Sequence, residues 1–437
     1  MAAPQPSTLY PRRFLFLQGI ASPFFRRLAR ELRRRGHDVR RINLCLGDRL
    51  FWNGRNATDY RGSLKNWPEF IAAYYRREGI TDLVLFGDCR PYHARALEAA
   101  RAAGLHLHVF EEGYIRPDWI TLEHNAVNAG SSLPRDPCQI RQLAHELPAT
   151  RQPHRHIPAS FVTRAFWDVC AAVATEFGLA FYPFYRRHRP HHPVFEYTSW
   201  IGRLLRKSSR ERHASAVMAR VEAYAGPLFL LPLQLDSDYQ IRVHSPFRSM
   251  AEVTDHVMES FARCAPSHAR LVVKVHPLDN GLVNKMRQTC RLAHKHGIAD
   301  RVEVMDGGHL PSLLMQMRGV VLVNSTVGTQ ALHYGISVKT LGNALYDIEG
   351  LTCRKPLDRF WSEPTPPDDE LFRDFFHLMK ARTQINGGFY SRPGIAIAVE
   401  ETLRRLELTV PVPQAPSRES ADAGVTGRAA PLAIHLR

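Results

Sequence analysis

Residues 14–44 read FLFLQGIASPFFRRLARELRRRGHDVRRINL, and this stretch decides the fold. Its apolar run at 14–17 predicts a strand, and the helical spacing of apolar residues over 23–35 ends at Gly36. Residues 38–44 then predict a second strand. A strand–helix–strand unit of this kind is typical of the start of a doubly wound α/β fold.

The pattern continues with predicted strands at 83–86 and 105–110, separated by a predicted helix over 92–103. In open α/β sheets, ligands bind beyond the carboxyl ends of the strands. Polar side chains directly after these strands are therefore candidates for a binding site. They are Gln18, Asp88, Glu111 and Glu112.

A second series of alternating strands and helices begins near residue 228. Its predicted strands are 228–233, 271–275, 302–305, 319–323 and 337–341. Two such series predict an α/β, GT-B-like fold, in which two Rossmann-like domains face a central cleft. Other two-domain α/β proteins share this outline, so the fold alone does not decide the function.

The 437 residues divide into five predicted regions. Residues 151–220 contain twelve Lys and Arg against four Asp and Glu, with aromatic residues among them, and predict basic helices between the domains. One C-terminal helix is expected to pack back on the first domain. The regions are 1–135, the first domain; 136–225, a helical insert or linker; 226–365, the second domain; 366–408, C-terminal helices; and 409–437, a Pro- and Ala-rich tail expected to be disordered.

Composition limits the partners and the compartment. The chain has 58 Lys and Arg against 42 Asp and Glu, a net charge of +16, which favours anionic partners. Its seven cysteines are scattered without a CxxC pair, which indicates reduced thiols and neither disulfides nor a zinc site. The sequence shows no secretory signal and no long uncharged apolar run, so a cytoplasmic protein is expected.

The segment Lys274-Val-His276-Pro277 ends a predicted strand of the second domain. Proline stops the strand because it has no N–H group to donate. Lys274 and His276 could hold a phosphate or assist its departure as a leaving group. The alternative is a histidine that makes a structural hydrogen bond at the end of a strand.

The segment 324–329, NSTVGT, lies between a predicted buried strand and a helix start. Backbone N–H groups at a helix start, with the hydroxyls of Ser325 and Thr326 and the small Gly328, make a natural phosphate site. The alternative is an ordinary helix cap, in which a hydroxyl closes the first turn. This segment is not a Walker P-loop, because it lacks Gly-Lys-Ser/Thr.

Two adjacent carboxylates, Glu111 and Glu112, follow a predicted strand and precede Gly113. Such a position places at least one of them in the cleft. It could act as a general base or orient an acceptor hydroxyl. The alternative is that one glutamate is solvated and the other pairs with Arg116.

In the segment 234–240, QLDSDYQ, polar residues recur at every second position. On an extended segment they share one face. Asp236 or Asp238 could therefore be a nucleophile or a base. The alternatives are a polar turn or a Mg²⁺ site, although no flanking ligands compel a metal.

Six motifs together resemble a known family. They are FLQG (16–19), FGDCRPYH (86–93), FEEGYIRPDWITLE (110–123), PLQLDSDYQI (232–241), KVHP (274–277) and NSTVGTQALHYG (324–335). In this order they are similar to the capsular polysaccharide β-Kdo transferases of Gram-negative bacteria, specifically the enzyme that places the first Kdo on a lipid. The HP and Ser/Thr motifs are shared more widely with bacterial sialyltransferases, which use CMP-activated sugars.

The resemblance implies a retaining glycosyltransferase with CMP-β-Kdo as donor and a phosphatidylglycerol-type lipid as acceptor, and with no metal or other cofactor. The first domain would present the acceptor and the second the donor. The resemblance also implies a location at the inner face of the inner membrane. The partners would include an anionic membrane surface, the elongating poly-Kdo transferase and the capsule export machinery.

The resemblance also implies roles for individual residues. Asp236 would attack the anomeric carbon, with Asp238 as the alternative, and Glu112, with Glu111, would handle the acceptor proton. The donor-binding residues would be Lys274, His276, Pro277, Ser325, Thr326, Gly328 and Gln234. The acceptor-binding residues would be Gln18, Asp88 and Arg116.

Other functions stay open at this point. The net charge would fit a nucleic-acid-binding protein, but no recognition helix motif, zinc knuckle or RNP-type aromatic pattern is present, so no nucleic acid is expected. A non-catalytic partner in capsule assembly or export is a second alternative, and another CMP-sugar transferase of the sialyltransferase type is a third. Parts of 151–220, with the arginine cluster at 26–35, are expected to dock on the anionic inner leaflet, or else form a solvated basic face.

Overall fold

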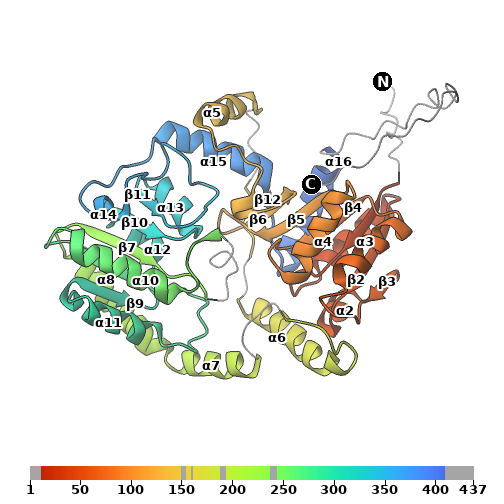
Figure 1. Ribbon diagram of the computed structural model, residues 1–437, viewed down its shortest axis with the longest axis horizontal. Helices are drawn as coiled ribbons and strands as arrows, with labels where there is room; N and C mark the ends of the chain where they lie inside the picture. Colours follow the sequence, from red (N-terminus) through yellow and green to blue (C-terminus); the bar gives the residue numbers. More distant parts are fainter. Residues whose placement is uncertain (1–10, 149–153, 159–160, 188–192, 237–243, 409–437) are drawn as a thin grey trace, which may run out of the picture.

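The computed structural model of the protein describes residues 11–148, 154–158, 161–187, 193–236 and 244–408. Within these residues the chain forms two α/β units that lie side by side (Figure 1). Asp238 and the tail from residue 409 lie outside the described residues, so what the sequence predicts for them stays a prediction.

The first unit is built on a sheet of seven strands in the order β12-β6-β5-β4-β1-β2-β3. Strands β1 to β5 run parallel, whereas β6 pairs antiparallel with both β5 and β12. The strands are β1 (Arg13–Phe16), β2 (Asp38–Asn43), β3 (Ala57–Asp59), β4 (Asp82–Phe86), β5 (His106–Glu112), β6 (Trp119–His124) and β12 (Gln384–Asn386). The helices are α1 (Phe24–Arg34), α2 (Leu46–Trp52), α3 (Trp67–Glu78), α4 (Pro91–Ala102) and the 3₁₀ turn η1 (Asn128–Gly130).

Both faces of this sheet are buried, and the start of the chain shows how the sequence achieves this. Phe14 and Phe16 join a core cluster with residues of α1 and of α16 (Arg392–Leu408). Leu15 and Leu17 join the cluster on the other side, with residues of α3 and α4. Because successive strand residues alternate between the two faces, an uninterrupted apolar run fits a strand that is covered on both sides.

The second unit contains a parallel sheet of five strands in the order β11-β10-β7-β8-β9. The strands are β7 (Leu228–Pro232), β8 (Arg270–Lys274), β9 (Val302–Met305), β10 (Gly319–Leu322) and β11 (Ser337–Thr340). The helices are α8 (Lys207–Glu222), α10 (Met250–Cys264), α11 (Lys285–Lys295), α12 (Leu310–Leu314), α13 (Val327–His333), α14 (Leu357–Phe360) and the turn η3 (Ala299–Arg301). Two Rossmann-like units of this kind confirm the predicted α/β, GT-B-like fold.

The segment between the two sheets supplies helices that pack on different parts of the molecule. α5 (Pro137–Glu146) packs against α15 (Asp369–Thr383), and α6 (Phe161–Phe177) packs on α2 of the first unit. After the turn η2 (Gly178–Ala180), α7 (Pro193–Leu205) leads into α8, which packs against β9 of the second sheet. The basic segment therefore bridges the two units.

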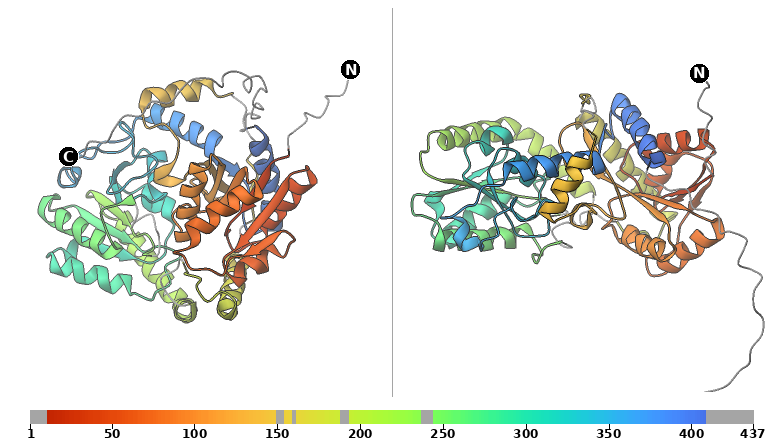
Figure 2. Two further views of the ribbon diagram at one scale, coloured as in Figure 1. Left: turned by 45° about the vertical axis from the view of Figure 1, so that its right-hand side comes forward. Right: turned by 90° about the horizontal axis from the view of Figure 1, so that it is seen from above.

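The C-terminal segment returns to the first unit, as the sequence predicts. β12 joins the first sheet directly after α15, and α16 packs on α1. Figure 2 shows α15, in blue, between the two units. Within the described part of the chain, no helix combines the length and apolar character that crossing a bilayer requires.

Several local predictions need correction. The sequence pattern did not predict β3, β6 and β12, nor α2 and α3. β5 extends through Glu112, because β6 pairs with it up to the Glu112–Ile120 pair. Glu111 and Glu112 are thus the last residues of the strand and not part of the loop after it. α11 begins at Lys285, and the side chain of Asn284 caps its first turn.

Candidate functional site

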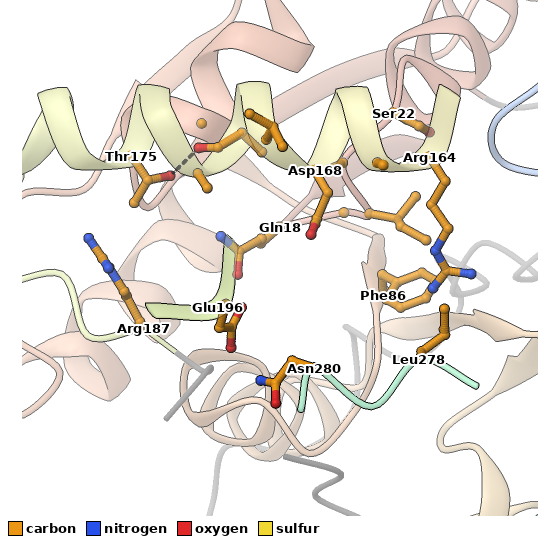
Figure 3. A pocket seen from close by; sticks show the side chains of 18 of the residues that line it. Gln18, Ser22, Phe86, Arg164, Asp168, Thr175, Arg187, Glu196, Leu278 and Asn280 are labelled. Atoms are coloured by element: carbon orange, nitrogen blue, oxygen red, sulfur yellow. Dashed lines mark hydrogen bonds between the residues drawn. The ribbon is translucent and has the colours of Figure 1, made fainter. Parts of the chain in front are cut away.

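A cavity of about 860 Å³ lies between the two units. Its lining comes from the segment after β1, from α2, from the end of β5, from α6 and α7, and from the loops after β7 and β8. Figure 3 shows Arg164 and Asp168 reaching into it from α6, with Leu278 and Asn280 on the loop after β8. Of the predicted site residues, the cavity brings together Gln18, Glu111, Glu112 and Asp236.

Gln18 is held at the cavity wall by its amide group. Its Nε2 atom donates to Asp48 Oδ2 over 3.3 Å and to the Tyr185 hydroxyl over 3.1 Å. Its Oε1 atom accepts from Arg90 Nη1 over 3.4 Å. Gln18 is buried, and this set of contacts fixes its orientation where the first parallel strand ends.

The two glutamates at the end of β5 lie on the same wall. Glu112 forms an ion pair with Arg164 of α6, with 3.1 Å between Oε1 and Nη2. Glu111 lies beside Gly87, where a Cβ atom would stand 3.4 Å from Glu111 Oε2. Gly87 has a φ of +71°, a conformation that suits glycine, so the loop after β4 can pass next to the carboxylate.

Asp236, from the loop after β7, lies on the opposite wall. Its Oδ1 atom accepts from the backbone N–H of Met250 over 3.2 Å, at the start of α10. Its Oδ2 atom forms an ion pair with Lys285, the first residue of α11. The Lys285 side chain is 5% exposed, whereas that of Asp236 is 34% exposed. Asp236 is therefore the member of the pair that faces the cavity more openly.

The end of β8 is organised differently from the prediction. Lys274 does not line the cavity, because its ammonium group donates to the backbone carbonyls of Gly307 and Gly308. Burial lowers the pKa of Lys274 below its ordinary value. The residues directly after Pro277 line the cavity instead: Leu278, Asp279 and Asn280.

His276 is a neutral imidazole at neutral pH. Burial, together with the positive charges of Arg116 and Arg164, lowers its pKa to about 4. Its Nδ1 atom accepts from the backbone N–H of Leu278 over 3.0 Å. The ring proton is therefore on Nε2. His276 is half-buried and is not among the residues that line the cavity.

The segment 324–329 forms a compact start to α13 and does not line the cavity. The hydroxyl of Ser325 accepts from the backbone N–H of Val327, and Thr326 is the residue that precedes α13. Gly328 packs so closely on Tyr346 that an added Cβ would lie 2.2 Å from the hydroxyl of that tyrosine. Thr326, which occupies the cap position, makes no side-chain hydrogen bond to the first turn of α13. The phosphate-site and helix-cap interpretations of this segment both stay predictions.

Gln234 forms two hydrogen bonds within the second unit. Its Nε2 atom donates to Asn324 Oδ1 over 2.9 Å, and its Oε1 atom accepts from the backbone N–H of Asn324 over 3.2 Å. This paired contact ties the end of β7 to the end of β10. It lies outside the cavity lining.

Two predicted acceptor-binding residues lie away from the cavity lining. Asp88 accepts from the backbone N–H of Val127 over 3.1 Å and so holds the loop after β6. Arg116 donates through Nε to the carbonyl of Gly113 over 3.3 Å, and its charge acts on His276. Neither residue lines the cavity, although Arg116 is exposed and its charge acts on the His276 ring.

The cavity also contains charged residues that the sequence motifs did not indicate. Arg164 and Asp168 are four positions apart on α6, a spacing that places both on one helix face and could have indicated a site. The others come from separate segments and offered no such signal. The missed charged residues are Arg41, Asp48, Arg90, Arg164, Asp168, Arg187, Glu196, Asp279 and Lys285. Among the described residues, no group of three or more His, Cys, Asp and Glu side chains is arranged to hold a metal ion.

Residues 81–390 match the sequence model of a family described as capsule polysaccharide biosynthesis protein. The chain belongs to this family. Five of the six motifs that carried the resemblance lie inside the matched range, and only FLQG (16–19) precedes it. Membership of the capsule polysaccharide biosynthesis family confirms the relationship that these motifs indicated.

Relatives of this capsule family member match it over more than four fifths of the chain. The capsule polysaccharide export protein KpsS of Escherichia coli is 34% identical over 386 residues, which cover 87% of this chain and 97% of KpsS. The capsule polysaccharide modification protein LipB of Neisseria meningitidis serogroup A is 35% identical over 388 residues, which cover 86% of this chain and 91% of LipB. Among solved structures, the β-Kdo 2,7 transferase of Thermosulfurimonas dismutans KpsC is 15% identical with a TM-score of 0.44, over 90% of this chain and 100% of that chain.

Proposed function

We propose that this capsule polysaccharide family member is a retaining glycosyltransferase. It transfers Kdo from CMP-β-Kdo to a phosphatidylglycerol-type lipid and so initiates the poly-Kdo linker of a capsule. The observation that carries this proposal is the cavity between the units, where Glu111 and Glu112 on one wall face Asp236 and Lys285 on the other. Carboxylates and cations on facing walls suit an acidic donor and a hydroxyl acceptor.

The charges of the cavity fit an anionic donor. CMP-Kdo carries one phosphate and one sugar carboxylate, and both need positively charged or hydrogen-bond-donating partners. Lys285 and Arg164 reach the cavity from the two sides. His276, neutral and protonated on Nε2, could donate to a phosphate oxygen as CMP leaves.

Asp236 is the proposed nucleophile. Its carboxylate would attack the anomeric carbon while the bond from that carbon to the CMP phosphate breaks, and CMP would leave with the bonding electrons. A donor phosphate near Lys285 would compete with Asp236 for the ammonium group and so release the carboxylate for attack. Asp238, two residues later, remains the alternative nucleophile.

Glu112, with Glu111 beside it, is the proposed general base. In the second step the acceptor hydroxyl attacks the anomeric carbon, the bond to Asp236 breaks, and the hydroxyl proton passes to the glutamate. Two displacements on opposite faces of the carbon give net retention. The protein would act at the inner face of the inner membrane, with the elongating poly-Kdo transferase and the export machinery as partners.

A direct assay tests this function. The purified protein is incubated with CMP-Kdo, generated in situ, and a short-chain fluorescent phosphatidylglycerol, and the product is read by mass spectrometry. We expect the lipid to gain the mass of one Kdo residue, which is Kdo less one water. A folded protein that binds CMP and forms no product would point to another acceptor or another acidic sugar.

A non-catalytic role in capsule export is the second candidate, because the E. coli relative is named as an export protein. Absence of both product and CMP binding would favour this role. Loss of capsule in cells that carry a folded Asp236→Asn protein would favour the enzyme, because an export scaffold does not need the charge of one cavity carboxylate.

A further inference from the structure

Exposed apolar side chains are concentrated in one part of the molecule. Thirteen of the seventeen exposed large hydrophobic side chains in the described residues lie between Phe161 and Leu205. Soluble proteins rarely expose contiguous apolar patches beyond a few hundred Å², and larger ones mark interaction surfaces. The exposed apolar side chains at 161–205 therefore indicate an interaction surface.

One helix face accounts for much of this surface. Val162, Phe166, Val169, Val173 and Phe177 are all exposed, with exposed fractions from 38% to 77%. Their spacing of four, three, four and four positions places them on one side of α6. The face of α6 that carries this stripe is thus apolar along the whole helix and is not covered by the described chain.

The surface continues through the following turn onto α7. Phe181 and Phe184 are each 59% exposed, and at the end of α7 Ile201 and Leu204 are each 58% exposed and Leu205 is 83% exposed. Figure 1 shows α6 and α7 next to each other along the lower edge of the molecule, beneath the two units. We call these residues, together with the α6 stripe, the α6–α7 surface.

The α6–α7 surface runs into the cavity. Phe161, Val169, Ile201 and Leu204 are exposed and also line the cavity. Gln18 and Glu112, in contrast, lie on its polar wall. A path with an apolar mouth and a polar interior fits an amphiphile whose chains stay outside while its headgroup enters.

The charge around this surface favours an anionic bilayer over an uncharged partner. Residues 151–220 carry twelve Lys and Arg against four Asp and Glu, and five of the arginines form ion pairs within the protein: Arg164, Arg187, Arg203, Arg210 and Arg220. Arg206 and Lys207 are exposed directly after the apolar end of α7. Basic residues beside an apolar helix face are typical of helices that lie in the membrane interface.

We propose that the α6–α7 surface inserts into the interface of an anionic bilayer, and that the lipid acceptor enters the cavity laterally between α6 and α7. The membrane contact rests on the exposed apolar residues and on the basic residues beside them, and it does not depend on the proposed function. The lateral entry rests on the proposed function, because it assigns a route to the acceptor of that reaction.

Vesicle binding tests the membrane contact. The full-length protein is sedimented with equimolar phosphatidylcholine–phosphatidylglycerol vesicles, and the variant Phe166→Ser/Phe177→Ser is compared with Met315→Ser. Met315 is 62% exposed on the second unit and lies outside the α6–α7 surface, so it is a matched control. We expect the double variant to lose about tenfold or more in its partition constant, because it no longer buries two large apolar side chains, and the control to bind as wild type.

Vesicle binding at high salt distinguishes insertion of the apolar side chains from electrostatic attraction to the anionic surface. Raising the salt from about 0.1 M to about 1 M screens surface charges, and wild type should keep a part of its binding that the double variant lacks. Equal binding of wild type and double variant, or no wild-type binding to anionic vesicles, would overturn the proposal. So would a concentration-dependent dimer that the double variant abolishes while lipid binding stays unchanged, because the surface would then serve a second copy.

Activity tests the lateral entry. Phe166 and Phe177 are not among the residues that line the cavity, so the double variant should act on a dispersed short-chain acceptor as wild type does. On a long-chain acceptor embedded in vesicles it should be about tenfold slower or more. Equal loss on both acceptors would overturn the route. An inactive wild type that still binds vesicles would refute the proposed function and leave the membrane contact standing.

Discussion

Arg164 forms an ion pair with Glu112 across the boundary between the bridging segment and the first sheet, with 3.1 Å between Nη2 and Oε1. Arg164 is on α6, the helix whose opposite side carries the exposed apolar stripe. Glu112 is the last residue of β5. The helix proposed to touch the bilayer therefore also positions a charged group at the cavity wall.

The charge of Arg164 should be measurable at His276. Replacing Arg164 by Gln removes a positive charge that disfavours the imidazolium, so the pKa of His276 should rise from about 4. It should stay below the ordinary 6.5, because burial is the larger cause of the shift. NMR titration of labelled histidines, with His276→Gln to assign the signal, measures this change. The exposed Arg318→Gln should leave the signal where it is.

Asp236→Asn should abolish transfer while leaving the protein folded. Asparagine can still accept from the backbone N–H of Met250, but it cannot attack the anomeric carbon. We expect kcat to fall by about 10³-fold or more, as is usual when a nucleophile is lost. Asp255→Asn is the control, because Asp255 forms an exposed ion pair with Lys295 on the outside of the same unit. Equal activity of the two variants would remove Asp236 from the mechanism.

Arg203 should stabilise the second unit strongly. It forms two hydrogen bonds with Asp306, of 2.9 and 3.0 Å, and both side chains are buried. Arg203→Ala should lower the free energy of unfolding by about 3 kcal/mol, because it leaves a buried carboxylate short of a partner. Arg203→Lys should recover only part of this loss, because lysine cannot make the paired contact. Urea denaturation measures both changes.

The matched control for this prediction is Arg220→Ala. Arg220 makes a similar paired contact with Glu303, of 2.7 and 3.0 Å, but its side chain is 49% exposed. Exposed ion pairs contribute about 1 kcal/mol or less. Equal losses for Arg203→Ala and Arg220→Ala would show that burial does not set the strength of the Arg203 contact.

Glu123 should make the stability of the protein fall as pH rises. Burial raises its pKa from 4.5 to about 7, although the hydroxyls of Tyr114 and Ser131 donate to it. The folded state therefore holds a proton that the unfolded state has lost, and stability present below pH 4.5 is lost as pH rises through 7. The loss should be about 3 kcal/mol.

Glu123→Gln removes this titration. The free energy of unfolding is measured across the pH range. Relative to wild type, the free energy of unfolding of the variant should rise by about 3 kcal/mol from acid to neutral pH. Glu98→Gln, at an exposed position on α4, should show no such gain. A constant difference between Glu123→Gln and wild type at every pH would contradict the assignment.

Gly328 should tolerate no side chain. A Cβ atom there would stand 2.2 Å from the hydroxyl of Tyr346, which is buried and donates to the carbonyl of Ser325. Gly328→Ala should lower the free energy of unfolding by about 1–3 kcal/mol through overpacking. Gly202→Ala on α7, where no atom lies within 4 Å of the new Cβ, should be neutral or stabilising by up to about 1 kcal/mol. Thermal denaturation of both variants compares them.

The periodicity of the chain was enough to establish the two α/β units. The FLFL run of β1 and the apolar runs in β7, β8 and β10 of the second sheet are uninterrupted, which is the pattern of strands that are buried on both faces. The short edge strands β3 and β12 escaped prediction, because each has three residues and too little pattern to identify it. β12 also pairs with a strand more than 250 positions away, at Gln384 and Thr121.

Polar residue types at and after the carboxyl ends of the strands also located one part of the site. Gln18, Glu112 and Asp236 lie at the cavity, because parallel strands bring their carboxyl ends to one edge of a sheet. Lys274 and Asp88 also lie at or just after the end of a strand, but their side chains form hydrogen bonds with backbone groups of the protein and do not line the cavity. The end of a strand fixes the position of a residue. The direction of its side chain depends on which hydrogen-bonding partners the folded chain places near it.

Only the tertiary structure decided the charge pairs of the cavity. Lys285 reaches Asp236 from the start of another helix, and Arg164 reaches Glu112 from the segment between the units. Likewise, the stripe on α6 is visible as an apolar helix face in the sequence, but its exposure is not. Local spacing determines which residues share a face, and only the packing of distant segments determines whether that face meets protein, a ligand or a membrane.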